Sequence, residues 1–494
     1  MYLLGYDIGS SSVKAALVDV DANKTVGVTQ SPQTEMEISA PQPDWAEQHP
    51  DDWWINVQKA TKELLRETGI EPNLIKGIGI SYQMHGLVIV DSDQNVIRPS
   101  IIWCDSRAVE IGDQAFKELG EDYCFNHLLN GPGNFTASKL KWVKENEPQL
   151  FEKIHKCMLP GDFIAMKMTG EIRTTAVGLS EGMMWDFASN QVASGILDHF
   201  GIDQHLVPEL VPMIGDQGSL ADEAASILGL SPGIPVGYRS GDQPNNAMSL
   251  NVLEPGEVAG TGGTSGVVYG VVDQNVCDKQ QRVNTFAHVN HSKESPKLGV
   301  LLCINGAGIQ YGWVKNQLNQ SGSYSQMEEA ISSIPIGSDG LRIIPFGNGA
   351  ERIFNNRNLG SHVNNLHFNR HNNSHYFRAA LEGIAFSFAY GIDILKELGL
   401  EIEVIKVGND NLFQSPVFSN TVASLANANI EVIETTGAVG AARAAGVAAG
   451  VYRNINEATE KINVVKVYES ASKNDLYKKS YDLWLEDLEK LLID

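Results

Sequence analysis

Apolar and polar positions divide the start of the chain into short strands separated by polar turns. Leu3 to Asp7 is a short apolar run, Gly9 to Ser12 is a turn of small residues, and Val13 to Asp19 is apolar again. Short apolar runs bounded by glycine, serine and aspartate are typical of β-strands and the turns between them. The pattern predicts a β-hairpin followed by a turn at residues 21–23.

A helix and another strand follow this hairpin. Proline and two acids at residues 50–52 indicate a helix start, and the apolar residues from Trp54 to Leu65 approximate one helical face. An apolar run from Ile75 to Tyr82 then predicts a strand. Alternation of strands with helices favours an α/β fold with a mixed sheet.

The same strand–turn–strand pattern returns near Gly256. Glu257 to Ala259 and Gly266 to Val272 are apolar runs on either side of the glycine-rich loop Gly260 to Ser265. Because this arrangement repeats that of the N-terminus, we expect two similar halves, each carrying one glycine-rich turn.

The last quarter of the chain predicts further alternation. Strands at residues 403–407 and 430–433 enclose a polar loop at residues 408–411 and a helix. Small residues from Ala438 to Ala449 predict a closely packed helix, and residues 476–492 predict an amphipathic one.

Length and composition set the general class of protein. The chain has 494 residues, more than one hydrophobic core usually organises, so we expect two domains, residues 1–248 and residues 249–494. Hydrophobic residues make up 43% and charged residues 20%, as in ordinary globular enzymes. The net charge of −23 disfavours nucleic acid and membranes as partners. A phosphate site in so acidic a chain should be built mainly from glycine turns.

Cysteine usage and the N-terminus predict a cytoplasmic protein. The five cysteines are odd in number and never form a CxxC pair, which disfavours a disulfide framework or a zinc site. The N-terminus has no basic region, and no apolar stretch of about 18 residues occurs.

Two glycine-rich turns are candidate phosphate sites. Asp7 stands at a predicted strand end and is a candidate for holding Mg²⁺ through water. The candidates for contact with the β- and γ-phosphates of ATP follow it: Ser10, Ser11, Ser12 and Lys14. Thr261 to Gly266 offers a second turn, whose glycines let the backbone approach an anion closely. The alternative is an ordinary hairpin turn in each place, but two such turns, each near one aspartate, favour the phosphate interpretation.

Asp242, between Gly241 and Gln243, is a candidate general base. The residues that follow it are polar and poor in cations, so we expect a pKa near the ordinary value of about 3.9 and an ionised carboxylate at neutral pH. The alternative is an aspartate that caps a helix starting near Pro244.

Two short motifs predict a polyol pocket. Gln83, Met84 and His85 end a predicted strand, where α/β folds commonly place ligand-binding groups. Trp103 and Asp105 follow another apolar run and offer an aromatic platform and a carboxylate for sugar hydroxyls. Each motif alone is equally compatible with a structural role.

Two patterns that resemble metal sites are interpreted otherwise. The segments beginning at Asp19 and Asp91 open like calcium loops but lack the glycine and the closing glutamate, so we expect hairpin turns. The histidines between His362 and His375 have helical ligand spacing, yet their polar surroundings favour a solvated loop.

Taken together, these motifs resemble the FGGY family of carbohydrate kinases, and within it most closely the xylulokinases. The motifs that carry the resemblance are DIGSSSVK at the N-terminus, QMHG at 83–86, IIWCDSR at 101–107, KLKWVKEN at 139–146, GDQ at 241–243, GTGGTSG at 260–266 and HYFRAALEGIAF at 375–386. The resemblance implies a two-domain actin-like ATPase fold, related to ribonuclease H, with a deep interdomain cleft. It places the sugar on the N-terminal side and ATP on the C-terminal side, with Mg²⁺ as the metal cofactor.

The resemblance also assigns roles to residues. Asp242 matches the catalytic base, which would deprotonate the terminal hydroxyl of D-xylulose. The positions that match sugar contacts are Met84, His85, Asp105 and Gln243. The positions that match the nucleotide site are Ser10 to Ser12, Gly263, Thr264 and Ser265 for phosphate, and Gly306 and Gln310 for adenosine.

The chain departs from the family pattern in two loops. Gly408-Asn409-Asp410-Asn411 replaces a run of glycines expected to bind the nucleotide, and residues 349–353 read Gly-Ala-Glu-Arg-Ile in place of Gly-Glu-Arg-Thr-Pro. The first departure leaves the nucleotide preference open.

Three alternatives remain at the level of sequence. The first alternative to a D-xylulose kinase is a kinase for another ketose or polyol, such as ribulose, fuculose or gluconate. The other two are a non-catalytic actin-like ATPase and a sugar sensor. The oligomeric state, with a homodimer among the options, is also open.

Overall fold

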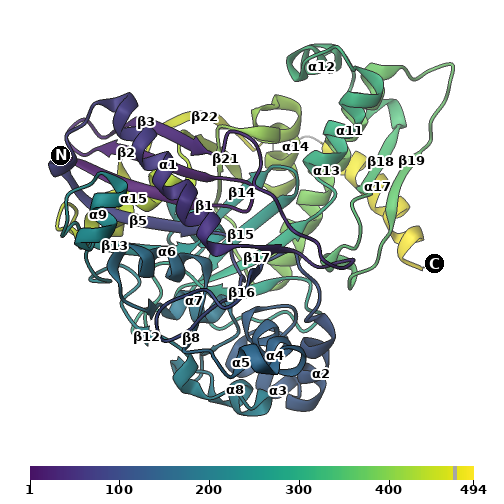
Figure 1. Ribbon diagram of the computed structural model, residues 1–494. Coiled ribbons are helices and arrows are strands. Elements are labelled where there is room, and N and C mark those ends of the chain that lie inside the picture. The colour runs from purple at the N-terminus through teal and green to yellow at the C-terminus, as the bar shows by residue number, and fades with distance from the viewer. Residues whose placement is uncertain (471–474, 494) are drawn as a thin grey trace. The chain divides into compact units, whose positions relative to one another are not determined.

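The chain forms two compact units in a computed structural model that describes residues 1–470 and 475–493 (Figure 1). The first unit comprises Met1–Leu253, Phe286–Leu298 and Thr435–Lys461. The second comprises Glu254–Thr285, Gly299–Glu434 and Ile462–Asp494. The single division predicted after residue 248 differs from these units, because the chain returns to the first unit late in the sequence.

A five-stranded mixed sheet organises the first unit. Its strand order is β13-β5-β1-β2-β3. The bounds are β1 (Tyr2–Ile8), β2 (Val13–Asp19), β3 (Lys24–Ser31), β5 (Ile75–Tyr82) and β13 (Val236–Gly241). Strands β1, β2 and β3 pair antiparallel, and β5 and β13 run parallel to β1. The predicted N-terminal hairpin and the strand at residues 75–82 are thereby confirmed.

Helices fill the rest of the first unit. They are α1 (Pro50–Thr68), α2 (Val109–Leu119), α3 (Glu121–Tyr123), α4 (Thr136–Asn146), α5 (Pro148–Phe151), α6 (Pro160–Thr169), α7 (Ala176–Glu181), α8 (Ser194–Phe200), α9 (Asp222–Leu228), α10 (Asp242–Ser249), α15 (Gly437–Ala448) and α16 (Ile455–Glu460). Short strands lie between them, namely β4 (Glu47–Gln48), β6 (Val88–Val90), β7 (Ser100–Ile101), β8 (Lys156–Met158), β9 (Arg173–Thr174), β10 (Trp185–Asp186), β11 (Gln191–Val192) and β12 (Glu209–Leu210). The helix predicted from residue 50 is α1, whose N-cap is the side chain of His49.

Glycines bring α15 close to the sheet of the first unit. A Cβ built on Gly5 of β1 would lie 1.9 Å from the carbonyl oxygen of Ala438, and one on Gly79 of β5 would lie 2.0 Å from that of Ala441. In Figure 1 this late helix accordingly lies against strands from the start of the chain. The predicted small-residue helix is confirmed, and its alanines and the sheet glycines serve close packing.

The second unit repeats the strand order of the first. Its large sheet runs β16-β17-β15-β14-β20-β21-β22. The strands are β14 (Glu257–Gly262), β15 (Gly266–Val272), β16 (Asn284–Ala287), β17 (Leu298–Ile304), β20 (Val404–Gly408), β21 (Asn429–Ile433) and β22 (Val464–Tyr468), with a separate hairpin of β18 (Arg342–Phe346) and β19 (Gly360–Asn364). As β1 does, β14 pairs antiparallel with the next strand and parallel with a later one. The expectation of two similar halves is therefore confirmed.

Helices complete the described part of the second unit. They are α11 (Gly308–Leu318), α12 (Tyr324–Ile331), α13 (Asn373–Glu397), α14 (Pro416–Ala426) and α17 (Asp475–Ile493). The amphipathic helix predicted at residues 476–492 is α17, which buries Trp484 against the rest of the unit. Across the described ranges, no helix is both long and apolar enough to cross a lipid bilayer.

Candidate active site

The parallel strands of the first unit end at one edge of its sheet, and this edge gathers the predicted catalytic residues. In register, Asp7 lies beside Ser81 and Ile8 beside Tyr82, while Gly241 pairs with Tyr82 on the other side of β5. The residues after each strand therefore meet at the same edge, as the crevice rule for α/β sheets requires. They are the Gly9–Ser12 turn, the Gln83–His85 turn and Asp242.

Asp7 is held between a hydroxyl and a helix N-terminus. Ser81 Oγ donates to Asp7 Oδ1 at 3.0 Å. A Cβ on Gly437, the first residue of α15, would lie 2.9 Å from Asp7 Oδ2, so glycine permits this approach. Burial raises the pKa of Asp7 above its ordinary value, and Lys14 and Ser81 partly offset that rise.

The hydroxyl residues of the first glycine turn differ in their exposure to solvent. Gly9 N donates to the Ser12 carbonyl at 3.0 Å, which closes the turn, and Gln48 Nε2 donates to the Ser10 carbonyl at 2.7 Å. Ser12 is buried, whereas Ser11 is exposed and so is Lys14 on β2. Among the predicted phosphate contacts, Ser11 and Lys14 are thus exposed and Ser10 is half-buried.

Asp242 is the first residue of α10 and does not cap it. The residue before it, Gly241, occupies the N-cap position without a side-chain cap. The alternative of a capping aspartate is therefore wrong, and so is the predicted ordinary pKa. Burial, reinforced by the nearby carboxylate of Asp7, raises the pKa of Asp242 to about 7, with a partial offset from hydrogen bonds of Gln243. Sequence neighbours could not reveal this because Asp7 lies in a different strand.

The Gln83–His85 turn is fixed to its surroundings by main-chain and side-chain contacts. Gln83 N donates to the Ile8 carbonyl at 2.8 Å, and Gln83 Nε2 donates to Gln48 Oε1 at 3.3 Å. Met84 packs so closely on Gly241 that a Cβ there would lie 2.6 Å from Met84 Cγ. The turn that carries the predicted sugar contacts is thereby packed against the residue that precedes Asp242.

The two members of the Trp103–Arg107 motif have different environments. Asp105 is fully buried, and its carboxylate accepts hydrogen bonds from Ala46 N at 2.6 Å and from Arg107 Nη2 at 2.7 Å. This carboxylate therefore organises the protein interior instead of offering an open acceptor. Trp103 is 53% exposed, and its Nε1 donates to Ser10 Oγ at 3.4 Å, beside the first glycine turn.

Three polar residues near this edge were not singled out from the sequence. Asn245, fully buried on α10, accepts from Tyr238 Oη at 3.1 Å and donates to the Gly437 carbonyl at 3.0 Å, which ties α10 to α15. Lys139 and Glu181 are buried beside His85. Lys139 opens the KLKWVKEN motif, but Glu181 and Asn245 carried no signal of their own.

In the second unit, the second glycine turn is bound to the start of α11. Gly263 and Thr264 accept from Gly308 N at 3.1 Å and from Ile309 N at 3.0 Å, and Ser265 leads into β15. A Cβ on Gly308 would lie 2.2 Å from the Gly263 carbonyl oxygen, so this contact requires glycine. The turn is thus fixed through its carbonyl groups.

Glu351, from the divergent 349–353 loop, supports the adenosine-side positions. Its carboxylate accepts from Asn305 N at 3.0 Å and Gly306 N at 2.8 Å. Gly306 in turn lies against β18, where a Cβ would be 2.2 Å from the Pro345 carbonyl oxygen. Gln310 is buried on α11. Gly306 therefore serves a close backbone approach.

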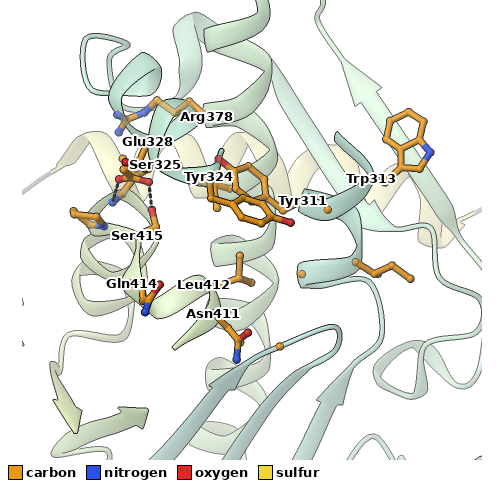
Figure 2. Close-up of a pocket in the computed structure, with 18 of the residues that line it drawn as sticks. Tyr311, Trp313, Tyr324, Ser325, Glu328, Arg378, Asn411, Leu412, Gln414 and Ser415 are labelled. Carbon is orange, nitrogen blue, oxygen red and sulfur yellow. Dashed lines mark hydrogen bonds between the residues drawn. The ribbon is translucent and has the colours of Figure 1, made fainter. Parts of the chain in front are cut away.

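A cavity of about 1440 Å³ lies within the second unit, next to the second glycine turn (Figure 2). Its walls come from α11, α12, α13, the segment 411–417 and α17. Of the predicted nucleotide residues in this unit, Gly263 and Thr264 line the cavity. Those outside its lining are Ser265, Gly306, Gln310, Gly408 and Asn409.

The cavity combines an aromatic pair with carboxamides and a carboxylate. The rings of Tyr311 and Tyr324 stack with centroids 5.7 Å apart and planes at 24°, and both lie toward the middle of Figure 2. Glu328 accepts from Ser415 Oγ at 2.7 Å, and Asn411 and Gln414 line the same space. Aromatic faces with a few polar groups are typical of a site for a nucleobase or similar ring.

The divergent Gly408–Asn411 loop keeps a defined backbone. Asn409 N donates to the Ile433 carbonyl at 3.0 Å and Asn409 Nδ2 to Glu434 Oε2 at 2.9 Å. Asn411 has φ of 49°, in the left-handed region that asparagine tolerates better than most residues. Asparagine thus occupies here a conformation for which glycine is the usual choice.

The histidines predicted to share one solvated loop do not do so, because His362 lies in β19 and His375 in α13. His375 Nε2 lies 3.2 Å from Asp339 Oδ2, and His367 Nε2 lies 2.9 Å from Asn365 Oδ1. Within residues 1–470 and 475–493, no group of three or more histidine, cysteine or acidic side chains has a metal-binding arrangement.

Comparison with protein families decides the class of this chain. The model of the N-terminal domain of the FGGY family of carbohydrate kinases matches residues 2–249, and that of its C-terminal domain matches residues 258–449. The chain belongs to the FGGY family of carbohydrate kinases. FGGY kinases transfer phosphate from ATP to a sugar, so the protein is an ATP-dependent sugar kinase.

Relatives and solved structures of FGGY kinases extend along the whole chain. A xylulose kinase of Bacillus subtilis (strain 168) is 29% identical over 98% of this chain and 96% of its own length. The crystal structure of a xyloylose kinase from Brucella ovis, 24% identical, covers 99% of both chains with a TM-score of 0.89. A Plasmodium falciparum glycerol kinase structure with ADP, 19% identical, reaches the same TM-score over 100% of this chain and 98% of its own. The fold is therefore that of FGGY sugar kinases, and the fold alone does not select the sugar.

Proposed function

We propose that the protein phosphorylates the terminal hydroxyl of a ketose, D-xylulose, with ATP, and that Asp242 is the general base. The observation that carries this proposal is the position of Asp242 at the strand edge, next to the Gln83–His85 turn and Asp7. The choice of sugar is supported by relatives named xylulose kinase that span nearly the whole chain.

In this proposal the first unit binds the sugar and activates it. Met84, His85 and Gln243 would contact the hydroxyls, with Trp103 as an exposed aromatic surface beside them. The Asp242 carboxylate would take the proton of the sugar's terminal hydroxyl. The oxygen of that hydroxyl would form a bond to the γ-phosphorus of ATP, while the bond between the γ-phosphorus and the bridging β-phosphate oxygen breaks and ADP leaves. A pKa raised to about 7 suits this role, because the carboxylate is a stronger base than an ordinary aspartate.

The nucleotide is proposed to occupy the cavity of the second unit. The tyrosine pair and the carboxamides of Asn411 and Gln414 would contact the base, and the amides of Gly263 and Thr264 would face the phosphates. In the first unit, Ser11 and Lys14 would contact phosphate, since both are exposed beside Asp7.

Asp7 is the proposed Mg²⁺ ligand. Mg²⁺ is usually held by one or two carboxylates together with water and substrate phosphates, so it requires no cage of three protein ligands. Asp7 fits, because its buried carboxylate lies at the strand edge and close enough to Asp242 to raise the pKa of that residue. When bound, Mg²⁺ neutralises charge on the transferring phosphate.

The test of the proposal is Asp242→Asn. We expect binding of sugar and nucleotide to persist, measured by calorimetry, while turnover falls roughly a hundredfold or more, as for loss of a general base. The matched control is Asp222→Asn, since Asp222 is likewise the first residue of its helix, α9, but is exposed. Near-normal turnover of Asp242→Asn would remove this residue from the role of base.

A panel of acceptors tests the sugar. Wild-type protein is assayed by coupled ADP release with D-xylulose, ribulose, fuculose and gluconate. We expect the highest kcat/KM for D-xylulose. Preference for another acceptor would move the protein to a different member of the same family, and ADP release without any acceptor would support a non-catalytic ATPase role.

We further propose a cytoplasmic location. All five cysteines are free thiols, in keeping with a reducing compartment. Fractionation of the source cells with compartment markers tests this.

A further inference from the structure

His85 has an unusual backbone conformation for a residue with a side chain. Its φ is 63°, in the left-handed region where a Cβ meets the adjacent carbonyl oxygen. The residue after it, Gly86, would adopt such a conformation more readily, yet the histidine carries it. A non-glycine residue persists there only when its surroundings impose it.

Two buried side chains bind the two polar groups of the His85 backbone. The N–H of His85 donates to Glu181 Oε2 at 3.3 Å. The carbonyl oxygen of His85 accepts from Lys139 Nζ at 2.8 Å, and Lys139 also donates to the Ile102 carbonyl at 3.1 Å. Glu181 is 1% exposed and Lys139 is 0% exposed. Because both are out of water, each contact excludes solvent as a competing partner.

The imidazole of His85 is oriented by the same region. Its Nδ1 lies 2.9 Å from the carbonyl oxygen of Glu181. The ring meets Phe135 edge-on at 4.8 Å between centroids and is tilted against Phe286 at 5.4 Å. The main chain of Glu181 and the aromatic rings therefore set the ring plane, while the side chains of Glu181 and Lys139 set the backbone from which the ring projects.

We infer that Glu181 and Lys139 are paired positioning residues that hold the backbone of His85 left-handed and so aim its imidazole at the sugar. Neither side chain touches the sugar in this account, since both are buried beneath the turn. The inference rests on the proposed function, in which His85 contacts the ketose.

The contacts with His85 distinguish Glu181 and Lys139 from a buried pair with a purely structural role. Asp162 and Arg239 also form a buried pair in the first unit, with Arg239 Nη1 3.2 Å from Asp162 Oδ1. Neither of them has a contact with His85 among those of the described residues. Asp162→Asn is therefore a matched control, because it removes a buried charge without releasing the turn.

The kinetic test compares KM for sugar with KM for ATP. In Glu181→Ala and in Lys139→Met we expect KM for D-xylulose to rise roughly tenfold to a hundredfold, the scale for a misplaced contact, with KM for ATP unchanged. Glu181→Gln retains an acceptor oxygen and should stay within about threefold of wild type. Asp162→Asn should lower the melting temperature without changing KM for D-xylulose. Equal changes in both KM values, or an Asp162→Asn that matches Glu181→Ala, would overturn the inference.

A double-mutant cycle tests whether the effect passes through His85. Glycine adopts the left-handed conformation without cost. His85→Gly therefore removes the imidazole and also the need for Glu181 and Lys139 to hold the backbone in that conformation. We expect Glu181→Ala to change KM for D-xylulose in the wild-type background and to have little further effect in His85→Gly. Additive effects would show that Glu181 acts elsewhere.

A crystal structure of Glu181→Ala gives a readout independent of activity. We expect residue 85 to leave the left-handed region or its ring to turn away from its present contacts. A crystal structure in which His85 keeps its φ and its ring position would overturn the inference even if kinetics change. Failure of the wild type to phosphorylate any ketose would instead overturn the proposed function. The crystal structure of Glu181→Ala would still show whether Glu181 holds the backbone of His85 in the left-handed conformation.

Discussion

At the scale of single residues, burial decides the protonation of the groups around the strand edge. Burial raises the pKa of Glu181 well above its usual range and lowers the pKa of Lys139 to about 7. Both shifts have the same cause, since each group loses water that would solvate its charged form. The neutral forms still provide an acceptor and a donor for His85.

Lys139 makes stability depend on pH in a defined direction. Its pKa is about 7 when folded and about 10.4 when unfolded, so between these values the unfolded chain binds more protons. The free energy of unfolding should therefore gain a contribution that grows as pH rises from 7 towards 10, by up to about 1.4 kcal/mol per pH unit. The measurement is urea denaturation of wild type and Lys139→Met at pH 7, 8 and 9.

The difference between the two proteins isolates the lysine from other titrating groups. We expect the free energy of unfolding of wild type minus that of Lys139→Met to increase with pH over this range. A difference that is flat or falls with pH would mean that Lys139 stays charged in the folded chain.

The residue types in the sequence predicted the chemistry of the site, whereas tertiary contacts determine the pKa values and hydrogen-bond partners of its side chains. The motif around Asp242 predicted a general base, and the structure places this carboxylate directly after strand β13. Its raised pKa comes first from burial and then from Asp7, which is distant in sequence. The carboxylate of Asp105 likewise accepts a hydrogen bond from Ala46 N, a residue that no local sequence pattern connects with Asp105. Glu181 does not belong to any motif that the sequence analysis identified. Its role comes from a contact with His85, which lies far from it in the sequence.

At the scale of elements, the close packing of α15 on the first sheet positions the site. The N-terminus of this helix lies at Asp7, and Asn245 joins it to α10, which begins with Asp242. A shift of α15 would therefore move both carboxylates. The alanine-rich composition predicted the helix and its close packing, but not which strands it would cover, since that requires the chain to return to the first unit.

Gly79→Val tests this packing. A Cβ at residue 79 would lie 2.0 Å from the Ala441 carbonyl oxygen, so the helix must move away from the sheet. We expect a loss of about 3 kcal/mol or more in the free energy of unfolding, together with reduced turnover, because overpacking forces backbone shifts. Urea denaturation and the coupled kinase assay measure the two effects.

Gly312→Ala is the control for this exchange. Gly312 lies inside α11 of the second unit, where a Cβ would meet only the Tyr324 hydroxyl at 3.5 Å, an ordinary contact distance. Alanine should leave stability unchanged or increase it by about 0.5–1 kcal/mol, the helix propensity difference. A Gly79→Val as stable as wild type would show that the sheet and α15 can separate at no cost.

At the scale of the whole molecule, the net negative charge acts differently on the two substrates as they approach the protein. The chain carries 60 acidic and 37 basic residues, and its net charge of −23 repels the anionic nucleotide but has no long-range effect on a neutral ketose. At about 10 mM ionic strength the Debye length is about 30 Å, so the field of the whole surface acts on approaching ATP. At 150 mM it is about 8 Å, and local groups such as Lys14 and the turn amides dominate.

Ionic strength should therefore change the kinetics of one substrate and not the other. Raising KCl from 10 to 150 mM at saturating Mg²⁺ should increase kcat/KM for ATP by about twofold or more, because screening removes the repulsion. The value of kcat/KM for D-xylulose, measured at saturating ATP, serves as the internal control and should stay constant, since an uncharged sugar feels no such field. A decrease in kcat/KM for ATP with salt would mean that local cations outweigh the acidic surface even at long range, and the charge argument would then fail.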